Sequence, residues 1–173
     1  MGRANALPSS HARGLLLPAL DDVFIGDRLA LRLFIRQLRL GAALAALVDV
    51  GQRSDLFLDV IEQHVQHNLV PAFWPPIKSG EPDYDVLEHL AAYGMRNTPG
   101  RYHNGGLWPV VSGFAAAAAR RHGRDDLADH LAQGIDAHNE KGEFPEFVDV
   151  NDYTAGGTLH MAWSAAASLW AHA

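Results

Sequence analysis

Apolar residues recur at helical spacing along most of this chain. Between residues 27 and 48, leucines fall on one face of a predicted helix, and arginines line another face. The same periodicity predicts further helices over residues 56–68, 83–92, 106–122, 125–137 and 158–173. No segment has the alternation of a β-strand, so the pattern predicts an all-α protein.

Residues with strong preferences at helix ends support these boundaries. Ser54 and Asp55 can cap the second predicted helix. Pro109 suits a first helical turn, and Gly123 is suited to end the same helix. Residues 71–82 contain four prolines, which remove backbone donors and block helix, so this stretch is predicted to be an ordered or extended loop.

The predicted helices differ in how much of their surface is apolar. The helices predicted over residues 106–122 and 158–173 are apolar or small on nearly all sides. The helix predicted over residues 125–137 has a single apolar stripe, formed by Leu127, Leu131 and Ile135. Helices that are apolar all round belong inside a fold, and amphipathic helices belong outside. The chain therefore predicts helical hairpins in two layers, with long loops at one end that are free to build a site.

The composition fits a globular protein and narrows the class of partner. The 173 residues are 48% hydrophobic and 20% charged, which is enough for a buried core. A formal net charge of -6 argues against nucleic acid or an anionic membrane and favours a small neutral ligand. Because the chain has no cysteine, disulfides and thiolate chemistry are excluded.

The sequence gives no sign of secretion or membrane insertion. The first ten residues lack a long apolar run, and the apolar stretch over residues 29–50 is interrupted by arginines. We therefore expect no transmembrane helix and a cytoplasmic location.

Three predicted loops combine aromatic rings with amides and carboxylates. They contain Phe-Trp-Pro-Pro at residues 73–76, Arg-Tyr-His-Asn-Gly-Gly-Leu-Trp-Pro at residues 101–109, and Phe-Pro-Glu-Phe-Val-Asp at residues 144–149. A pyranose has an apolar C–H face that stacks on aromatic rings, and its hydroxyls need paired donors and acceptors. These loops therefore favour a small carbohydrate as the ligand.

Two of these runs together match a known enzyme class. Asn-Thr-Pro-Gly-Arg-Tyr-His-Asn-Gly-Gly-Leu-Trp-Pro at residues 97–109, followed by Pro-Glu-Phe at residues 145–147, resembles the alkaline/neutral invertases and related α/α-toroid glycosidases. Glycogen-debranching-type glucosidases and mannosylglycerate hydrolases are looser relatives. The resemblance covers residues 40–173 and implies part of a six-hairpin toroid, preceded by a divergent segment over residues 1–39.

The resemblance implies an inverting glycoside hydrolase that acts on an α-linked glucoside. In such enzymes the glutamate of the Pro-Glu-aromatic motif is the general base that activates water, and this role falls on Glu146. Inversion also needs a carboxylic acid at a distance of about 6.5–9.5 Å. The family's acid is an aspartate in an upstream motif that this chain does not contain, so the resemblance implies a C-terminal part that is inactive alone. A missing N-terminal half or a homo-oligomer would complete it.

The expected sugar-binding residues come from all three loops and the last helix: Trp74, Lys78, Tyr102, His103, Asn104, Gly105, Trp108, His160 and Trp163. Three of them keep a structural alternative. Trp108 is equally suited to the core, and His160 and Trp163 either point toward the toroid axis or simply pack. We expect no cofactor and no metal, because no second ligand stands at metal-binding spacing from His103.

The carboxylates of the third loop also have ordinary alternatives. Most glutamates are solvated at the surface, but the neighbouring Phe144, Pro145 and Phe147 favour a functional Glu146. Asp149 and Asp152 are predicted to serve loop turns.

Two other functions remain open from the sequence. One is a catalytically dead helical module that binds carbohydrate or a partner through the same loops, and the other is a plain helical scaffold without a ligand. Sugar binding distinguishes these two from each other, and sugar hydrolysis distinguishes both from a glycosidase.

Overall fold

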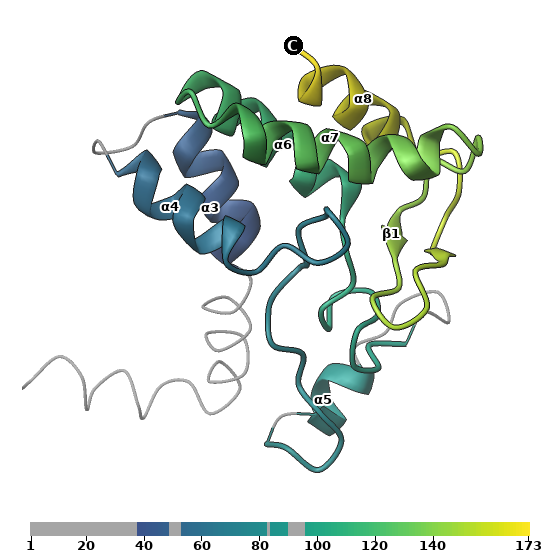
Figure 1. Ribbon diagram of the computed structural model, residues 1–173. Coiled ribbons are helices and arrows are strands. Elements are labelled where there is room, and N and C mark those ends of the chain that lie inside the picture. Colours follow the sequence, from purple (N-terminus) through teal and green to yellow (C-terminus); the bar gives the residue numbers. More distant parts are fainter. Residues whose placement is uncertain (1–37, 49–52, 83, 90–95) are drawn as a thin grey trace, which may run out of the picture. The chain divides into compact units, whose positions relative to one another are not determined.

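Helices account for about half of the residues that the computed structural model describes, namely residues 38–48, 53–82, 84–89 and 96–173 (Figure 1). Contacts between Cα atoms place these residues in one unit, Arg36–Ala173, separate from Met1–Ile35. The elements of this unit are α3 (Leu38–Leu47), α4 (Ser54–Glu62), α5 (Tyr84–His89), α6 (Pro109–Arg121), α7 (Asp125–Asn139), β1 (Phe147–Val148), β2 (Ala155–Gly156) and α8 (Ala162–Ala171). The predicted all-α class is confirmed.

Helix α6 lies at the centre of the packing, because it contacts α3, α7 and α8. Helix α4 packs on α3, and α7 also packs on α8. Small side chains allow the close approach of α6 and α8: a Cβ added at Gly113 would come within 2.7 Å of Ala167. Helix α7 buries one face only, formed by residues that include Leu127, Leu131 and Ile135. The predicted contrast between an apolar inner helix and an amphipathic outer helix therefore holds for α6 and α7. It does not hold for α8, which was also predicted to lie inside but leaves Leu169 and Trp163 exposed.

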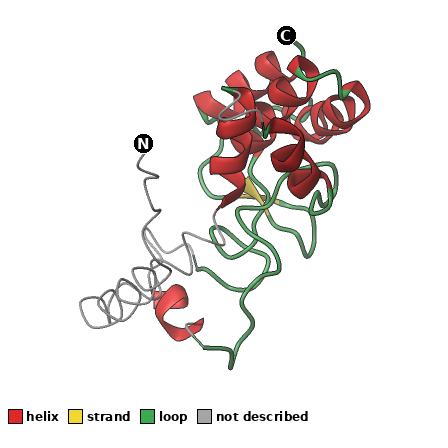
Figure 2. Ribbon diagram, turned by 90° about the vertical axis from the view of Figure 1, so that its left-hand side faces the viewer, coloured by secondary structure: helices red, strands yellow, loops and turns green. Residues whose placement is uncertain are grey.

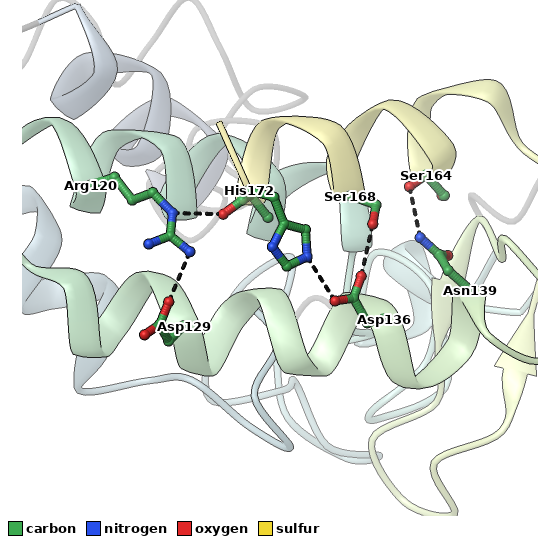
Figure 3. A network of polar contacts seen from close by, with 8 residues as sticks. Arg120, Asp129, Asp136, Asn139, Ser164, Ser168 and His172 are labelled. Atoms are coloured by element: carbon green, nitrogen blue, oxygen red, sulfur yellow. Dashed lines mark hydrogen bonds and ion pairs between the residues drawn. The ribbon is translucent and has the colours of Figure 1, made fainter.

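Polar side chains fasten α8 to its two neighbours (Figure 3). The Nε atom of Arg120 on α6 donates to the carbonyl of Ala171 at 2.8 Å. On α7, Asp136 accepts a hydrogen bond from Ser168 at 2.8 Å and lies 2.8 Å from Nε2 of His172. These contacts join the three helices beside an otherwise apolar interface.

Helix α4 is shorter than predicted, because a tight turn follows it. The helix ends at Glu62, whereas the prediction continued it to Asn68. His67 and Asn68 have φ angles of 48° and 61°, which no α-helix allows. Gln66 and Leu69 close this turn by exchanging two backbone hydrogen bonds of 2.9 Å. These φ angles and backbone bonds are incompatible with a continued helix.

Other predicted boundaries also move. Ser54 lies inside α4 and donates its hydroxyl to the carbonyl of Ala46 at 3.4 Å, so its predicted capping role is wrong. Helix α6 begins at Pro109, as that proline's fixed φ favours, and Gly123 follows its end with φ 71°. Helix α8 begins at Ala162, after residues 158–161 have run beside the third loop. The predicted helical residues 27–37 and 90–92 lie outside the described part.

Backbone hydrogen bonds join the three loops into one layer at one end of the helices (Figure 2). The Trp108 amide donates to the carbonyl of Val70 at 2.9 Å, which links the first loop to the second. Leu107 and Val148 exchange hydrogen bonds of 2.9 and 2.7 Å, which link the second loop to the third. The sequence therefore predicts the position of the loops, and the structure brings all three together.

The third loop contains a small antiparallel sheet that the sequence pattern did not predict. Strand β1 pairs with β2, with Phe147 opposite Gly156 and Val148 opposite Ala155. Two-residue strands are too short to show alternation, so the prediction of no strands is wrong for a simple reason. Within the described residues, no helix has both the length and the apolar content that crossing a bilayer requires.

Candidate active site

Glu146 is a buried carboxylate held by the backbone of a neighbouring segment. Glu146 is 7% exposed, and its Oε2 atom accepts a hydrogen bond from the Thr158 amide at 3.0 Å. The Glu146 amide in turn donates to the carbonyl of Thr158 at 2.8 Å. Oε1 has no hydrogen-bond partner among the described residues, so one oxygen is anchored and the other is available. This is the arrangement that a base needs in order to take a proton from water.

Gly157 makes room for the Glu146 side chain. A Cβ added at Gly157 would lie 2.7 Å from Oε2 of Glu146 and 2.8 Å from its Cβ. The φ angle of Gly157 is 72°, which side-chain-bearing residues rarely adopt. Both the available space and the backbone conformation therefore require a glycine at residue 157. In the sequence, the pair of glycines at residues 156–157 was the feature that could have indicated this close approach.

Four aromatic rings gather beside Glu146. The His103 ring stacks on Tyr102 with centroids 4.0 Å apart and on Trp108 with centroids 5.3 Å apart. Phe147, the residue after Glu146, contacts the edge of Tyr102 at 5.6 Å and stacks on Trp108 at 6.4 Å. The structure thus brings Tyr102, His103 and Trp108 together with the Pro-Glu-Phe motif, although these motifs are well separated in sequence.

Tyr102 has a strained backbone that its surroundings hold in place. Its φ angle is 44°, which is rare for an aromatic residue. Its carbonyl accepts hydrogen bonds from the Gly106 amide at 3.0 Å and from Nε1 of Trp108 at 3.2 Å. Strain of this kind persists where neighbouring contacts over-determine the conformation, and it is common at functional sites. The indole of Trp108 therefore helps to build the loop as well as the ring cluster.

The charge of His103 is set by two opposing effects. Burial lowers the pKa of His103 below its usual 6.5, and the nearby negative charge of Glu146 partly opposes this. Because burial is the larger effect, the imidazole is neutral at pH 7. A neutral imidazole offers one donor and one acceptor, which suits hydroxyl groups.

Asn104 is turned into the protein and organises the loops. Its residue is 0% exposed, and its Oδ1 atom accepts from the Ile77 amide at 2.8 Å. Its Nδ2 atom donates to the carbonyls of Ile77 and Asn97, both at 2.9 Å. Both amide hydrogens are therefore used internally, so the expectation that this side chain holds a sugar does not fit its geometry. Its position pins the first loop to the second.

Gly105 is needed for the packing of these two loops. Its φ angle is 90°, and an added Cβ would lie 2.7 Å from Cγ of Pro76. The residue is buried, so its main structural effect is to let the loop turn beneath the ring cluster.

An ion pair that sequence reasoning missed ties the second loop to the third. Nε of Arg101 lies 3.2 Å from Oδ2 of the buried Asp149. The other carboxylate oxygen accepts from the backbone of Asn151 at 2.8 Å, which is the turn role predicted for Asp149. Asp152 likewise accepts from the Thr154 hydroxyl at 2.6 Å. Arg101 lies in the recognised motif, and its position beside Tyr102 was the available signal.

The remaining predicted binding residues differ in exposure. Trp74 is half-buried and precedes a cis bond to Pro75, whereas Lys78 is exposed. His160 is exposed, and its amide donates to the carbonyl of Glu143 at 2.9 Å. Trp163 is 41% exposed near the start of α8. None of these contacts tests a role in sugar binding, and that role stays a prediction.

The described residues contain no group of three or more His, Asp or Glu side chains placed to hold a metal ion.

Comparison with known protein families agrees with the motifs in the second and third loops. The model of the alkaline and neutral invertase family matches residues 10–173. This chain belongs to that family. The match begins upstream of residue 40, at which the sequence analysis set the start of the resemblance.

Plant invertases are among the similar proteins. Probable alkaline/neutral invertase D of Arabidopsis thaliana is 28% identical over 155 residues, which cover 86% of this chain and 28% of that protein. Cytosolic invertase 1 of Oryza sativa subsp. japonica is 27% identical over 155 residues, which cover 86% of this chain and 27% of that protein. Neutral/alkaline invertase 1, mitochondrial, of the same rice is 27% identical over 113 residues, or 59% and 18% of the two chains. This invertase-family chain thus spans less than a third of the length of these relatives.

Replacement of His103 should change how stability depends on pH. Burial lowers its pKa in the folded state, so the unfolded chain takes up the proton first as pH falls. The contribution of His103 is full above its unfolded pKa of about 6.5 and is lost as pH falls toward the folded value. We expect His103→Gln to flatten the rise in unfolding free energy between about pH 5 and pH 7, measured by urea unfolding.

The exposed His130 on α7 gives the matched control, His130→Gln. An equal pH slope in wild type and His103→Gln would contradict the assignment.

Proposed function

We propose that this chain is a glycoside hydrolase-like domain that acts on an α-linked glucoside, such as sucrose or another small saccharide, by inverting hydrolysis. The observation that carries the proposal is Glu146: a buried carboxylate with one oxygen fixed by the Thr158 amide, beside a cluster of four rings. Membership of the invertase family supports a sugar substrate.

Glu146 acts as the general base. It takes a proton from water while the water oxygen forms a bond to the anomeric carbon of glucose, and the bond to the leaving oxygen breaks. The leaving oxygen carries the bonding pair and needs a proton from a second carboxyl group. Product configuration is inverted because water attacks from the face opposite the leaving group.

The ring cluster gives the sugar an apolar platform. Tyr102 and Trp108 are half-buried, so their rings combine a fixed position with access for a ligand. Neutral His103 supplies hydrogen bonds to hydroxyls, and Trp74, Lys78, His160 and Trp163 line the approach. Asn104 and Gly105 act through the loop that carries these rings.

In this proposal the general acid comes from outside the third loop. Other carboxylates of the third loop are already engaged: Glu143 with His138, Asp149 with Arg101, and Asp152 with Thr154. None is therefore free to hold a proton for a leaving group. A missing N-terminal half, or a second copy of the chain, completes the site.

Titration and hydrolysis test this function together. We would titrate the chain with sucrose, trehalose, maltose and glucosylglycerate by calorimetry, and measure glucose release by wild type and Glu146→Gln. Release that Glu146→Gln abolishes would establish a hydrolase whose acid lies within the 173 residues. The absence of both binding and release for every sugar would overturn the proposal.

One observation favours a second candidate function, a catalytically dead carbohydrate-binding module. The engaged state of Glu143, Asp149 and Asp152 leaves the base without a partner acid among the third-loop carboxylates. Sugar binding without release, also from substrates with good leaving groups, is the result that this alternative expects.

Apolar side chains just after α3 and on α8 predict that the isolated chain associates. Leu169 is 74% exposed, Val48 is 65% exposed and Trp163 is 41% exposed. Exposed apolar area of this kind is costly in water unless a partner covers it. We expect sedimentation to show self-association, or an apolar dye to bind, and Leu169→Gln to reduce either signal. A tight monomer that binds no dye would contradict this prediction.

We also propose a cytoplasmic location, with which the absence of cysteine is compatible. The names of the relatives include both cytosolic and mitochondrial invertases, so fractionation of the source cells is the test.

A further inference from the structure

His138 is a buried histidine that the catalytic proposal does not use. It lies in the last turn of α7 and is 1% exposed. Its Nδ1 atom lies 2.8 Å from Oε2 of Glu143. A carboxylate can only accept, so the imidazole carries a hydrogen on Nδ1 and donates it. The ring also packs against the edge of Tyr153, with centroids 4.8 Å apart.

The partner of His138 begins the short segment that ends at the candidate base. Glu143 precedes Glu146 by three positions in the sequence. Its amide donates to the carbonyl of His138 at 3.3 Å, and its own carbonyl accepts from the His160 amide at 2.9 Å. Side chain and backbone of Glu143 are therefore held together, at the point where the third loop leaves α7.

The segment between these two glutamates contains one strained residue, Phe144, and is anchored on both sides. Phe144 has a φ angle of 39°, and its carbonyl accepts from the Met161 amide at 2.9 Å. The next carbonyl, of Pro145, accepts from the buried hydroxyl of Ser164 at 2.5 Å. Ser164 is itself joined to Asn139 at the end of α7, whose Nδ2 atom donates to its carbonyl at 3.5 Å (Figure 3). Positive φ at a bulky residue persists only where such contacts over-determine it.

We propose that His138 is a positioning residue for Glu146: by holding Glu143, it fixes the upstream end of the strained segment whose downstream end presents the carboxylate to Thr158. This role rests on the proposed function of Glu146, whereas the hydrogen bond between His138 and Glu143 does not depend on that function. In this arrangement His138 on α7 binds the start of the segment at Glu143, and Ser164 on α8 binds its middle at Pro145. The Thr158 amide binds its end, the Glu146 carboxylate.

The second ring nitrogen argues against a packing role alone. Nε2 of His138 is buried and has no hydrogen-bond partner in the described part of the chain. A buried polar atom without a partner is unfavourable, and an apolar side chain would fill the same space without it. An apolar residue at this position could not make the hydrogen bond that Nδ1 of His138 donates to Glu143.

Two substitutions at the same site separate positioning from packing. His138→Leu keeps an apolar volume but removes the donor, whereas His138→Asn places an amide donor near the position of Nδ1. Glu143→Leu and Glu143→Gln form a second pair on the other side of the bond, and the Glu143 side chain is 31% exposed, so its replacement is tolerated if His138 variants do not fold. The amide of Gln still offers an acceptor, and Leu does not.

Hydrogen exchange at single amides reads the position of Glu146 directly. The Thr158 amide donates to Oε2 of Glu146, and the Ala116 amide in the buried centre of α6 reports global stability. We expect His138→Leu and Glu143→Leu to lower protection at Thr158 by about tenfold relative to Ala116, the loss typical of one charge-assisted hydrogen bond. His138→Asn and Glu143→Gln should restore most of it.

Three results would overturn the inference: unchanged protection at Thr158, an equal loss at Ala116, or Asn and Gln variants that behave like Leu. Turnover of α-glucosyl fluoride by the same variants should show a lower kcat with little change in KM, because a displaced base affects the chemical step. If wild type does not turn over this substrate, hydrolysis by the isolated chain is ruled out, while the exchange data still decide whether His138 positions the segment.

Discussion

Glu146→Gln should lower the release of fluoride from α-glucosyl fluoride by roughly 10²–10⁴-fold, the usual contribution of a general base. Fluoride leaves with the bonding pair and needs no proton, so this substrate reacts without the help of a general acid. Water then attacks the anomeric carbon, and Glu146 takes its proton. The measurement is the initial rate of fluoride release, followed with an ion-selective electrode.

The substitution is well suited to isolate the proton transfer. A glutamine at this position can still accept the hydrogen bond from the Thr158 amide, so the loop should keep its conformation. Glu140→Gln, which removes an exposed carboxylate just after α7, is the matched control and should retain the wild-type rate. Equal rates for wild type and Glu146→Gln, with sugar binding intact in both, would remove Glu146 from the chemistry.

Gly134→Ala should destabilise the fold by about 1–3 kcal/mol, the range typical of overpacking. This is opposite in sign to the usual effect, since alanine is favoured over glycine by about 1 kcal/mol inside a helix. An added Cβ would lie 2.2 Å from the carbonyl oxygen and 2.7 Å from the carbonyl carbon of Asn68. Urea unfolding with linear extrapolation would measure the change in unfolding free energy.

The turn that receives Gly134 cannot easily move away. Asn68 has a φ angle of 61°, and the hydrogen bonds between Gln66 and Leu69 close the turn on both sides. The exposed neighbour Gln133 provides the control, because Gln133→Ala should change stability by less than about 0.5 kcal/mol. A Gly134→Ala protein at least as stable as wild type would show that α7 and the turn are less tightly packed than the structure indicates.

The pairing of Arg101 with Asp149 and the bonds of Asn104 show how the loops acquire their order. Each of these side chains spans two loops: Arg101 reaches from the second to the third, and Asn104 from the second to the first. Loops that lack regular structure need such links to satisfy buried polar groups. The ring cluster beside Glu146 therefore stands on a polar framework, and the sugar-binding surface depends on residues that need never touch a sugar.

Local sequence patterns predicted those features that depend on near neighbours. The apolar spacing of α7, the proline at the start of α6 and the glycine after its end each act within one or two helical turns. The three aromatic loops and the two family motifs were likewise visible, because their residue types carry the chemistry themselves. The all-α class followed from these patterns, and the structure confirms it.

Which of the candidate residues share a site became clear only from the tertiary structure. Asn104 and His103 are adjacent in sequence, yet the side chain of Asn104 is used up by backbone hydrogen bonds, whereas the ring of His103 stacks on Tyr102 and on Trp108. Nothing in the local pattern distinguishes these two polar residues. The early end of α4 has the same origin, because the turn at residues 66–69 fits against Gly134, far along the chain.

Residue type and short-range spacing were thus enough to predict the presence of the main helices, the loops and the motif that carries Glu146. Three other features became visible only in the folded structure: the burial of that carboxylate, the hydrogen bond from the Thr158 amide to one of its oxygens, and the contact of His138 with Glu143. These features depend on contacts between residues that are distant in the chain, and one sequence's local periodicity contains no record of such contacts.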